Sequence, residues 1–404
     1  MKILWQNVHY PDITLGGGGA RNSRHITAAM RSLGHHVTFI SETKLPSETG
    51  SKTVYDSEVI YYLRPYLPER LWLIRGIRNC FGYYKATSQF APLHDAYFCN
   101  DPEIVFALKK HGRGKPIICR VEGTRAGDRA SWSSAKEDSL KAALFNKILR
   151  EEDDAISKAA WSRCNALLVK SRMIKDELIN WYGMSEKKIA VIPNGVNYTH
   201  FAEAAVNSKV LEELGERSEK EVRIVFVGRL SKVKNLEFLI RALPHIRTRN
   251  PYRLVIVGEG EERENLEALA MHLGVSEQTV FVGHQDNVAP YLAACQIFAL
   301  PSLYETIANC LLEAMSAGLS CVVLQPGKYN VRTSSDEVIF EGKTGFLTDG
   351  AEPTQMANAI ARLIDDPALR KSIGQSAQNE IKARFSWESC AQQYIDLARQ
   401  CLVT

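Results

Sequence analysis

Two short stretches place charged side chains directly after apolar runs, and both could do chemistry on a phosphorylated ligand. In the first, residues 228–235, Arg229 and Lys234 follow the apolar run 223–227. An arginine offers a planar fork of donors and a lysine a compact charge, so the two together could clamp a diphosphate. A solvated basic turn would have the same composition, and this loop alone leaves both interpretations open.

The second stretch, residues 301–315, carries two carboxylates, Glu305 and Glu313, eight positions apart. If a helix begins near Thr306, Glu305 lies at its mouth and Glu313 lies about 12 Å further along the axis, at about 1.5 Å per residue. The two could therefore hold opposite ends of an extended ligand such as a sugar nucleotide. Glu305 could instead be a first-turn acid that stabilises the helix dipole. Glu313 has apolar neighbours, among which a carboxylate requires a partner.

A third feature is the run Gly16-Gly17-Gly18-Gly19, which precedes a helical stretch at residues 20–33. Glycines allow backbone amides to close on an anion at a helix N-terminus. The run is not G-x-G-x-x-G, and a flexible loop without a ligand would look similar. Contact with a phosphate or a sugar is therefore one of two interpretations.

Short apolar runs alternate with helical stretches, which is typical of α/β proteins with parallel sheets. Strands are predicted in the first half at residues 3–6, 37–41, 59–63, 97–99, 117–121, 166–170 and 189–192. In the second half they are predicted at residues 223–227, 254–257, 280–282, 297–300 and 321–324. Three of these runs end in Val-Gly, at Gly228, Gly258 and Gly283. A ligand could approach the backbone closely at such strand ends.

A chain of 404 residues is too long for one ordinary core and predicts two domains. The polar stretch 197–221 has no strand pattern, so we expect domains at 1–200 and 201–385. Residues 386–404 have apolar positions at helical spacing and predict a closing helix that packs back towards the N-terminal domain. The nine cysteines contain no C-x-x-C pair and are interpreted as buried thiols. No metal site and no cofactor are predicted.

The net charge of +4 is unevenly distributed. Residues 1–200 hold 29 Lys+Arg against 20 Asp+Glu, a net charge of +9, whereas the rest hold 21 against 26, a net charge of −5. A basic half suits a phosphorylated acceptor or an anionic surface, although solvated surface charge would look the same. Residues 64–85 interleave basic and aromatic side chains, which predicts peripheral membrane contact, with ordinary helix packing as the alternative. No apolar run reaches the roughly 20 residues of a membrane span, and a cytoplasmic location is expected.

Taken together, these residues resemble the retaining glycosyltransferases of family 4, also called group 1. The resemblance covers nearly the whole chain and includes Pro193-Asn194-Gly195-Val196-Asn197, the Gly-Arg-Leu loop, the E-x7-E pair, Glu341-Gly342-Lys343-Thr344-Gly345-Phe346-Leu347 and the final helix. It implies an α/β fold of GT-B architecture, with two Rossmann-like doubly wound domains facing a central cleft.

The same resemblance implies an enzyme of hexosyltransferase type. It would transfer a sugar from a nucleotide diphosphate sugar, with UDP favoured, to a hydroxyl of a glycan, lipid-linked or small-molecule acceptor in polysaccharide or glycolipid synthesis. Metal independence is expected, because no D-x-D pattern follows a strand and two cations already stand near the leaving diphosphate. Nucleic acid is not an expected partner.

By motif position, the resemblance implies that Arg229 and Lys234 bind the diphosphate and act in catalysis with Glu305. The donor would also contact Gly17, Gly18, Gly228, Gly283, His284, Thr306, Ile307, Ala308 and Glu313. Within that set, Glu313 would accept from the ribose hydroxyls, and the base would lie near Gly283 and His284. Thr306-Ile307-Ala308 departs from the family pattern of a glycine or serine, an aromatic residue and a glycine.

On the acceptor side, Asn100 and Glu122 replace two histidines that are frequent in the family. Asn100 would hold the donor sugar. Glu122 would orient the acceptor hydroxyl or act as a base, or else form a salt bridge with Arg120 or Arg125.

Two other functions stay open at this stage. One is a nucleotide-sugar epimerase or a phosphorylase of the same architecture, and the other is a catalytically silent partner that binds sugar nucleotides. Release of nucleotide in a coupled assay would separate the transferase from both.

Overall fold

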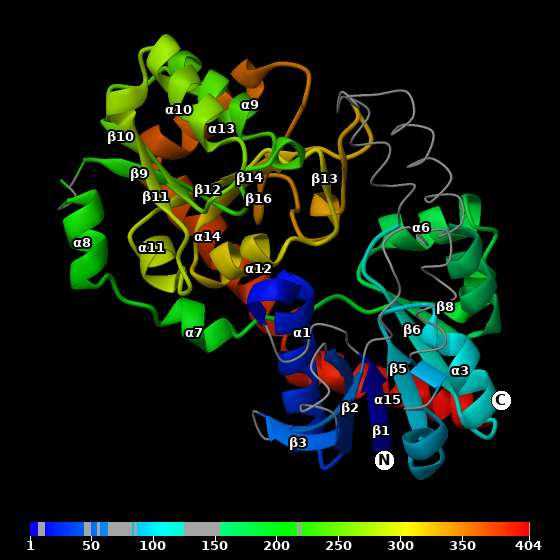
Figure 1. The fold of residues 1–404 in the computed structure, drawn as a ribbon. Coiled ribbons are helices and arrows are strands. Elements are labelled where there is room, and N and C mark those ends of the chain that lie inside the picture. The colour runs from blue at the N-terminus through cyan, green and yellow to red at the C-terminus, as the bar shows by residue number, and fades with distance from the viewer. Residues whose placement is uncertain are drawn as a thin grey trace. The chain divides into compact units, whose positions relative to one another are not determined.

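The computed structural model describes residues 1–6, 13–43, 50–54, 57–63, 83–84, 87–124, 154–215, 218 and 220–403 (Figure 1). These residues divide into two compact units. Unit 1 contains the described residues up to Gly195 and those from Trp387 onward, and unit 2 is Val196–Ser386. The sequence placed the first boundary at residue 200 and the second at 385. The membrane segment predicted at 64–85 lies outside the described residues, except for Tyr83 and Tyr84.

The described part of unit 1 forms an eight-stranded sheet in the order β3-β4-β2-β1-β5-β6-β7-β8. Its strands are β1 (Lys2–Gln6), β2 (His36–Thr43), β3 (Gly50–Val54), β4 (Ser57–Leu63), β5 (Ala96–Cys99), β6 (Ile117–Val121), β7 (Ala166–Val169) and β8 (Ile189–Val191). Neighbouring strands are parallel except for β3 and β4. Each predicted strand of the first half is present, and among the described strands of this unit only the polar edge strand β3 was not predicted.

Helices cover both faces of this sheet and include α1 (Ile13–Ser32), α3 (Ile104–His111), α6 (Arg172–Asn180) and α15 (Trp387–Val403). The predicted closing helix is α15, and it packs against α1. Beneath it, the Trp5 ring stacks on Phe98 and Tyr394, with ring centroids 5.1 and 6.0 Å apart. The last helix of the chain is therefore part of the core of unit 1.

One prediction in this unit is wrong. The run of four glycines was expected to be a loop before a helix at residue 20, but α1 begins at Ile13 and contains all four. Helix formation is cooperative, and later residues of α1, Ile26 and Met30, are fully buried. Each glycine costs only about 1 kcal/mol relative to alanine, so a packed helix can extend through them. Donor contact by Gly17 and Gly18 stays a prediction.

Unit 2 contains a six-stranded parallel sheet in the order β11-β10-β9-β12-β14-β16. The strands are β9 (Val222–Val227), β10 (Tyr252–Val257), β11 (Thr279–Gly283), β12 (Ile297–Leu300), β14 (Ser320–Leu324) and β16 (Gly345–Thr348). A separate parallel pair joins β13 (Tyr304–Glu305) to β15 (Arg332–Thr333). Every predicted strand of the second half is present, and β13, β15 and β16 are additional.

The helices of unit 2 are α7 (Tyr198–Ala202), α8 (Ser208–Leu214), α9 (Leu236–Ala242), α10 (Arg263–His272), α11 (Ala289–Ala293), α12 (Asn309–Ser316), α13 (Pro353–Asp365) and α14 (Pro367–Arg384). The first two occupy the polar stretch that was expected to contain no strand. None of the helices in the described part of the chain is long and apolar enough to cross a membrane.

Candidate functional site

The strand order of unit 2 fixes where a ligand should bind. If the six strands are numbered in chain order, their order across the sheet is 3-2-1-4-5-6. The direction of this order reverses between β9 and β12. In open α/β sheets, ligands bind at the carboxyl ends of the strands on either side of that reversal. The loop after β9 contains Arg229 and Lys234, and the segment after β12 contains Glu305. The topology therefore brings the two predicted stretches to one place.

Backbone contacts gather the three Val-Gly strand ends, as the sequence predicted. The Gly228 amide donates to the Val257 carbonyl at 3.0 Å, and the Gly258 amide donates to the Gly283 carbonyl at 2.9 Å. A Cβ atom on Gly258 would lie only 1.9 Å from the Gly228 carbonyl oxygen. Only glycine permits this approach, which fixes the start of the loop that carries Arg229 and Lys234.

The loop after β9 is shaped by its own backbone bonds. Leu230 is buried, and its amide donates to the Glu259 carbonyl at 2.9 Å. A single 3-10 turn, Lys232–Lys234, then ends at Asn235, whose left-handed φ of 53° starts α9. The Leu303 amide donates to the Val233 carbonyl at 2.9 Å, which joins this loop to the segment after β12.

Lys234 and Glu305 form an ion pair between Nζ and Oε2. About a fifth of each side chain is exposed, at 19% and 20%. Burial by itself would lower the pKa of Lys234, but the Glu305 carboxylate outweighs it, so the pKa of the ammonium is raised. Lys234 is thus held as a cation at the reversal of strand order, which suits the binding of a diphosphate.

The backbone around Glu305 differs from the prediction. Helix α12 begins at Asn309 rather than near Thr306, and Glu305 lies in β13. The Ser334 amide donates to the Glu305 carbonyl at 3.0 Å, while Ile307 and Ala308 are buried in the core, so these residues pair and pack rather than form a first turn. The distance expected for an unbroken helix between the two glutamates therefore does not apply.

The other predicted donor residues are placed as follows. Arg229 is exposed, Thr306 and Glu313 are half-buried, and His284 is 72% exposed and lies 3.4 Å from Asp286. The Ile307 and Ala308 side chains are buried, so only their backbone could meet a ligand. The donor roles of these residues stay predictions.

Cys310 is a site residue that sequence reasoning missed. It lies in the first turn of α12, and burial raises the pKa of its thiol to about 12, with Lys234, Glu305 and Glu313 as its charged neighbours. The thiol is therefore protonated at neutral pH. The sequence signal that could have identified Cys310 was its position in the chain between Glu305 and Glu313.

In unit 1, Glu122 follows β6 and pairs with two cations. Its Oε1 lies 3.1 Å from Arg120 Nε, and its Oε2 pairs with Lys170 Nζ. Arg120 is fully buried and donates from Nη2 to Asn194 Oδ1 at 2.8 Å. The salt bridge to Arg120 was one of the predicted alternatives. Lys170 was missed, although it is the last residue of the predicted strand 166–170 and directly follows β7.

We expect Glu122→Gln to lower the free energy of unfolding by about 1–2 kcal/mol, because buried Arg120 loses a charged partner. The matched control is Glu186→Gln in the same unit, whose exposed pair with Lys175 should make no measurable difference. Thermal denaturation of both variants checks this. Equal denaturation midpoints for the two variants would contradict a stabilising role for Glu122. Separately, turnover near wild type in Glu122→Gln would exclude Glu122 as an obligatory base.

Asn100 lies at the end of β5, and its Oδ1 accepts from Trp5 Nε1 at 3.2 Å. Its backbone amide donates to Gln6 Oε1 at 3.0 Å. The side-chain oxygen of Asn100 is thus bonded to the core of unit 1, and the contact of Asn100 with the donor sugar stays a prediction.

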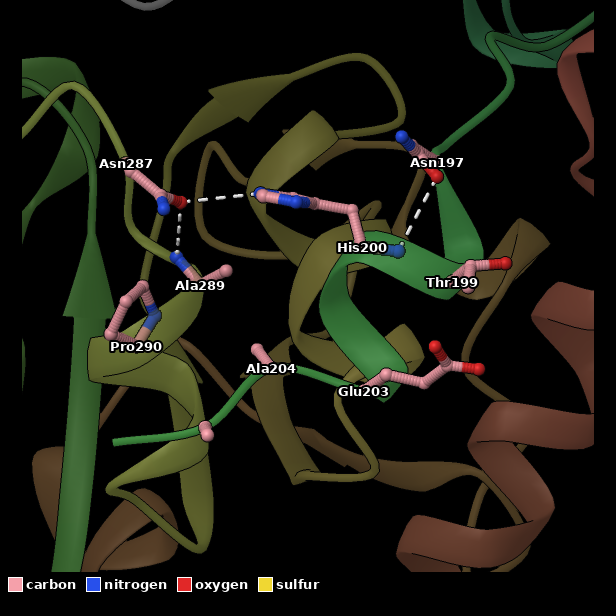
Figure 2. Close-up of a pocket in the computed structure, with 9 residues that line it drawn as sticks. Asn197, Thr199, His200, Glu203, Ala204, Asn287, Ala289 and Pro290 are labelled. Atoms are coloured by element: carbon pink, nitrogen blue, oxygen red, sulfur yellow. Dashed lines mark hydrogen bonds between the residues drawn. The ribbon is translucent and has the colours of Figure 1, made fainter. Parts of the chain in front are cut away.

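A pocket of about 460 Å³ lies elsewhere on unit 2, between α7 and the start of α11 (Figure 2). The His200 ring bonds through Nε2 to Asn287 Oδ1 at 3.2 Å, and the Ala289 amide donates to the same oxygen at 3.1 Å. Because an amide oxygen can only accept, His200 Nε2 is the donor in this bond. The His200–Asn287 bond connects α7 to the loop that follows β11. None of the predicted site residues lines this pocket.

Two units, each built on a largely parallel sheet, are the architecture of GT-B proteins, and solved structures superpose on this chain over its full length. The family profile "Glycosyl transferases group 1" matches residues 211–380, and "Glycosyltransferase Family 4" matches residues 16–200. An uncharacterized glycosyltransferase of Methanocaldococcus jannaschii is 30% identical, over 98% of this chain and 97% of its own length. The chain therefore belongs to the group 1, family 4 glycosyltransferases.

Solved structures agree on the fold. Sucrose-phosphate synthase of Thermosynechococcus elongatus superposes with a TM-score of 0.79 at 20% identity, covering 100% of this chain and 99% of its own. HepE of Anabaena, in complex with UDP, superposes with a TM-score of 0.74 at 18% identity, covering 99% and 100%. At these identities the likeness concerns the GT-B fold.

Proposed function

We propose that this glycosyltransferase is a metal-independent, retaining hexosyltransferase that uses a UDP-sugar and an acceptor hydroxyl in glycan, glycolipid or polysaccharide synthesis. The observation that carries the proposal is the Lys234–Glu305 pair at the strand reversal of unit 2. The choice of UDP is supported by HepE, a protein of the same fold that was solved with UDP. A cytoplasmic location and membrane contact through residues 64–85 stay predictions from the sequence.

The chemistry follows from the charges. When the bond between the anomeric carbon and the phosphate oxygen breaks, negative charge collects on the leaving diphosphate. Lys234 and Arg229 would neutralise that charge, which is the role a divalent metal has in other transferases. Glu305 keeps Lys234 protonated and in place, and its carboxylate can accept from hydroxyls of the donor sugar.

The acceptor oxygen then bonds to the anomeric carbon on the face that the diphosphate leaves. Its proton passes to the leaving phosphate oxygen, so the reaction requires no separate base. Configuration at the anomeric carbon is retained.

The proposal is tested by nucleotide release from UDP-, GDP- and ADP-sugars, each with and without EDTA. We expect release with a UDP-sugar at an unchanged rate in EDTA, because the two cations already stabilise the leaving group. A rate abolished by EDTA and restored by manganese would contradict metal independence. Sugar-nucleotide binding without release would favour a silent binding partner.

A further inference from the structure

Unit 1 has the same reversal of strand order as unit 2. Its parallel strands run β4-β2-β1-β5-β6-β7-β8, so the order reverses between β1 and β5, which lie side by side in the sheet (Figure 1). At the carboxyl ends of these strands stand Gln6, the last residue of β1, and Asn100 and Asp101, which follow β5. This is the position at which a ligand of unit 1 should bind.

Gln6 organises this end of the sheet. It is fully buried, and its Oε1 accepts from the backbone amides of Asn100 and Asp101, both at 3.0 Å. Its Nε2 donates to Tyr83 Oη at 2.9 Å and to Asp101 Oδ2 at 2.7 Å. The two donors and two lone pairs of the amide are therefore all used, and the backbone at Asp101 is fixed.

The same contacts fix one half of the Asp101 carboxylate. The hydroxyl of buried Tyr83 donates to Asp101 Oδ2 at 2.7 Å, so this oxygen accepts from two protein donors. Across the described part of the chain, Oδ1 receives no hydrogen bond, and the side chain is partly exposed. A carboxylate oriented through one oxygen thus has its other oxygen available to a ligand.

Neither predicted acceptor-side residue offers such an atom. Both oxygens of Glu122 pair with cations, and the Asn100 oxygen accepts from Trp5. Asp101 lies next to Asn100, at the strand reversal itself.

We infer that Asp101 binds the acceptor, with Oδ1 accepting a hydrogen bond from an acceptor hydroxyl. The inference rests on the proposed function. An ionised carboxylate accepts but cannot donate, so this position selects hydroxyl-bearing acceptors such as sugars and polyols. Asp101 orients the hydroxyl, and the proton still passes to the leaving phosphate oxygen.

The variant Asp101→Asn separates this role from a structural one. Its amide oxygen can accept from Tyr83 and Gln6 as Oδ2 does, whereas its amide nitrogen replaces Oδ1 and turns an acceptor into a donor. The matched control is Asp95→Asn just before β5, where Oδ2 accepts from the Lys2 backbone amide at 2.8 Å. Both variants keep their internal bonds, and only Asp101→Asn changes the proposed ligand contact.

Nucleotide release is measured with saturating UDP-sugar, in water alone and with a panel of free monosaccharides and p-nitrophenyl glycosides. An attacking hydroxyl is present in every case, so Asp101→Asn should lower the rates about 10- to 100-fold, the factor expected for a hydrogen bond to a charged group. Calorimetry with UDP should give the wild-type Kd, and Asp95→Asn should match wild type throughout.

Wild-type rates in Asp101→Asn would overturn the inference and leave the proposed function intact. Loss of UDP binding or of thermal stability in Asp101→Asn, but not in Asp95→Asn, would also overturn it, by showing a structural role. A wild-type protein that binds UDP but releases nucleotide from no donor would contradict the proposed function, and the inference would fall with it.

Discussion

Lys234→Ala is expected to weaken the binding of a nucleotide diphosphate about tenfold or more, because a charge-assisted hydrogen bond contributes about 1.5–3 kcal/mol. The loss has a second cause. Without the Lys234 ammonium, the Glu305 carboxylate loses its paired cation and repels the incoming diphosphate. Titration calorimetry with UDP measures the change, and sugar transfer should fall further than affinity, since charge on the leaving group grows in the transition state.

The control for this variant is Lys232→Ala, two residues earlier in the same turn. Lys232 is exposed, and no ion pair involving it is found among the described residues. Lys232→Ala removes the same charge from the same loop and should leave the Kd for UDP nearly unchanged. If the two variants bound UDP equally well, the diphosphate role of Lys234 would be wrong.

The stability that the raised pKa of Lys234 contributes depends on pH. The pKa of Lys234 is raised in the folded protein, so the stability it contributes is complete below the ordinary lysine pKa of about 10.4. That contribution is lost only as the pH rises through the raised pKa. At neutral pH Lys234 is therefore charged, and its titration would not change the activity between pH 6 and 8.

Much of the donor site was predictable because it depends on buried parallel strands. Continuous apolar runs gave β9 and β12, and the charged segments after them marked the site. The pairing of Lys234 with Glu305 was not predictable, because the two residues are 71 positions apart and only the strand order joins them. The start of α12 was missed because β13 is two residues long and depends on pairing with distant β15.

The acceptor side was less predictable for a similar reason. The contacts that orient Asp101 come from Gln6 and Tyr83, far apart in the sequence, and no local pattern identifies a bond between them. A polar residue at the end of the apolar strand β1 was the only signal. The glycine run was misjudged because local propensity was weighed without the packing of α1.

Gly258→Ala is expected to cause the largest loss of stability among the substitutions considered. Gly258 has φ +147°, and an added Cβ would lie 1.9 Å from the Gly228 carbonyl oxygen, so the backbone of two neighbouring strand ends must separate. Strain at such a φ and overpacking each cost about 1–3 kcal/mol, which gives a loss of about 2–6 kcal/mol in the free energy of unfolding. Denaturant titration measures this loss.

The control Gly274→Ala separates the two contributions. Gly274 has φ +69° with no atom within 4 Å of an added Cβ, so only the backbone conformation is penalised, at about 1–2 kcal/mol. The clash at Gly258 should also displace the loop that begins at Gly228 and carries Lys234. Gly258→Ala should therefore lose affinity for UDP even where it is still folded, whereas Gly274→Ala should keep it. Equal losses of stability and unchanged UDP binding in both variants would show that the close approach of these strand ends does not position the diphosphate loop.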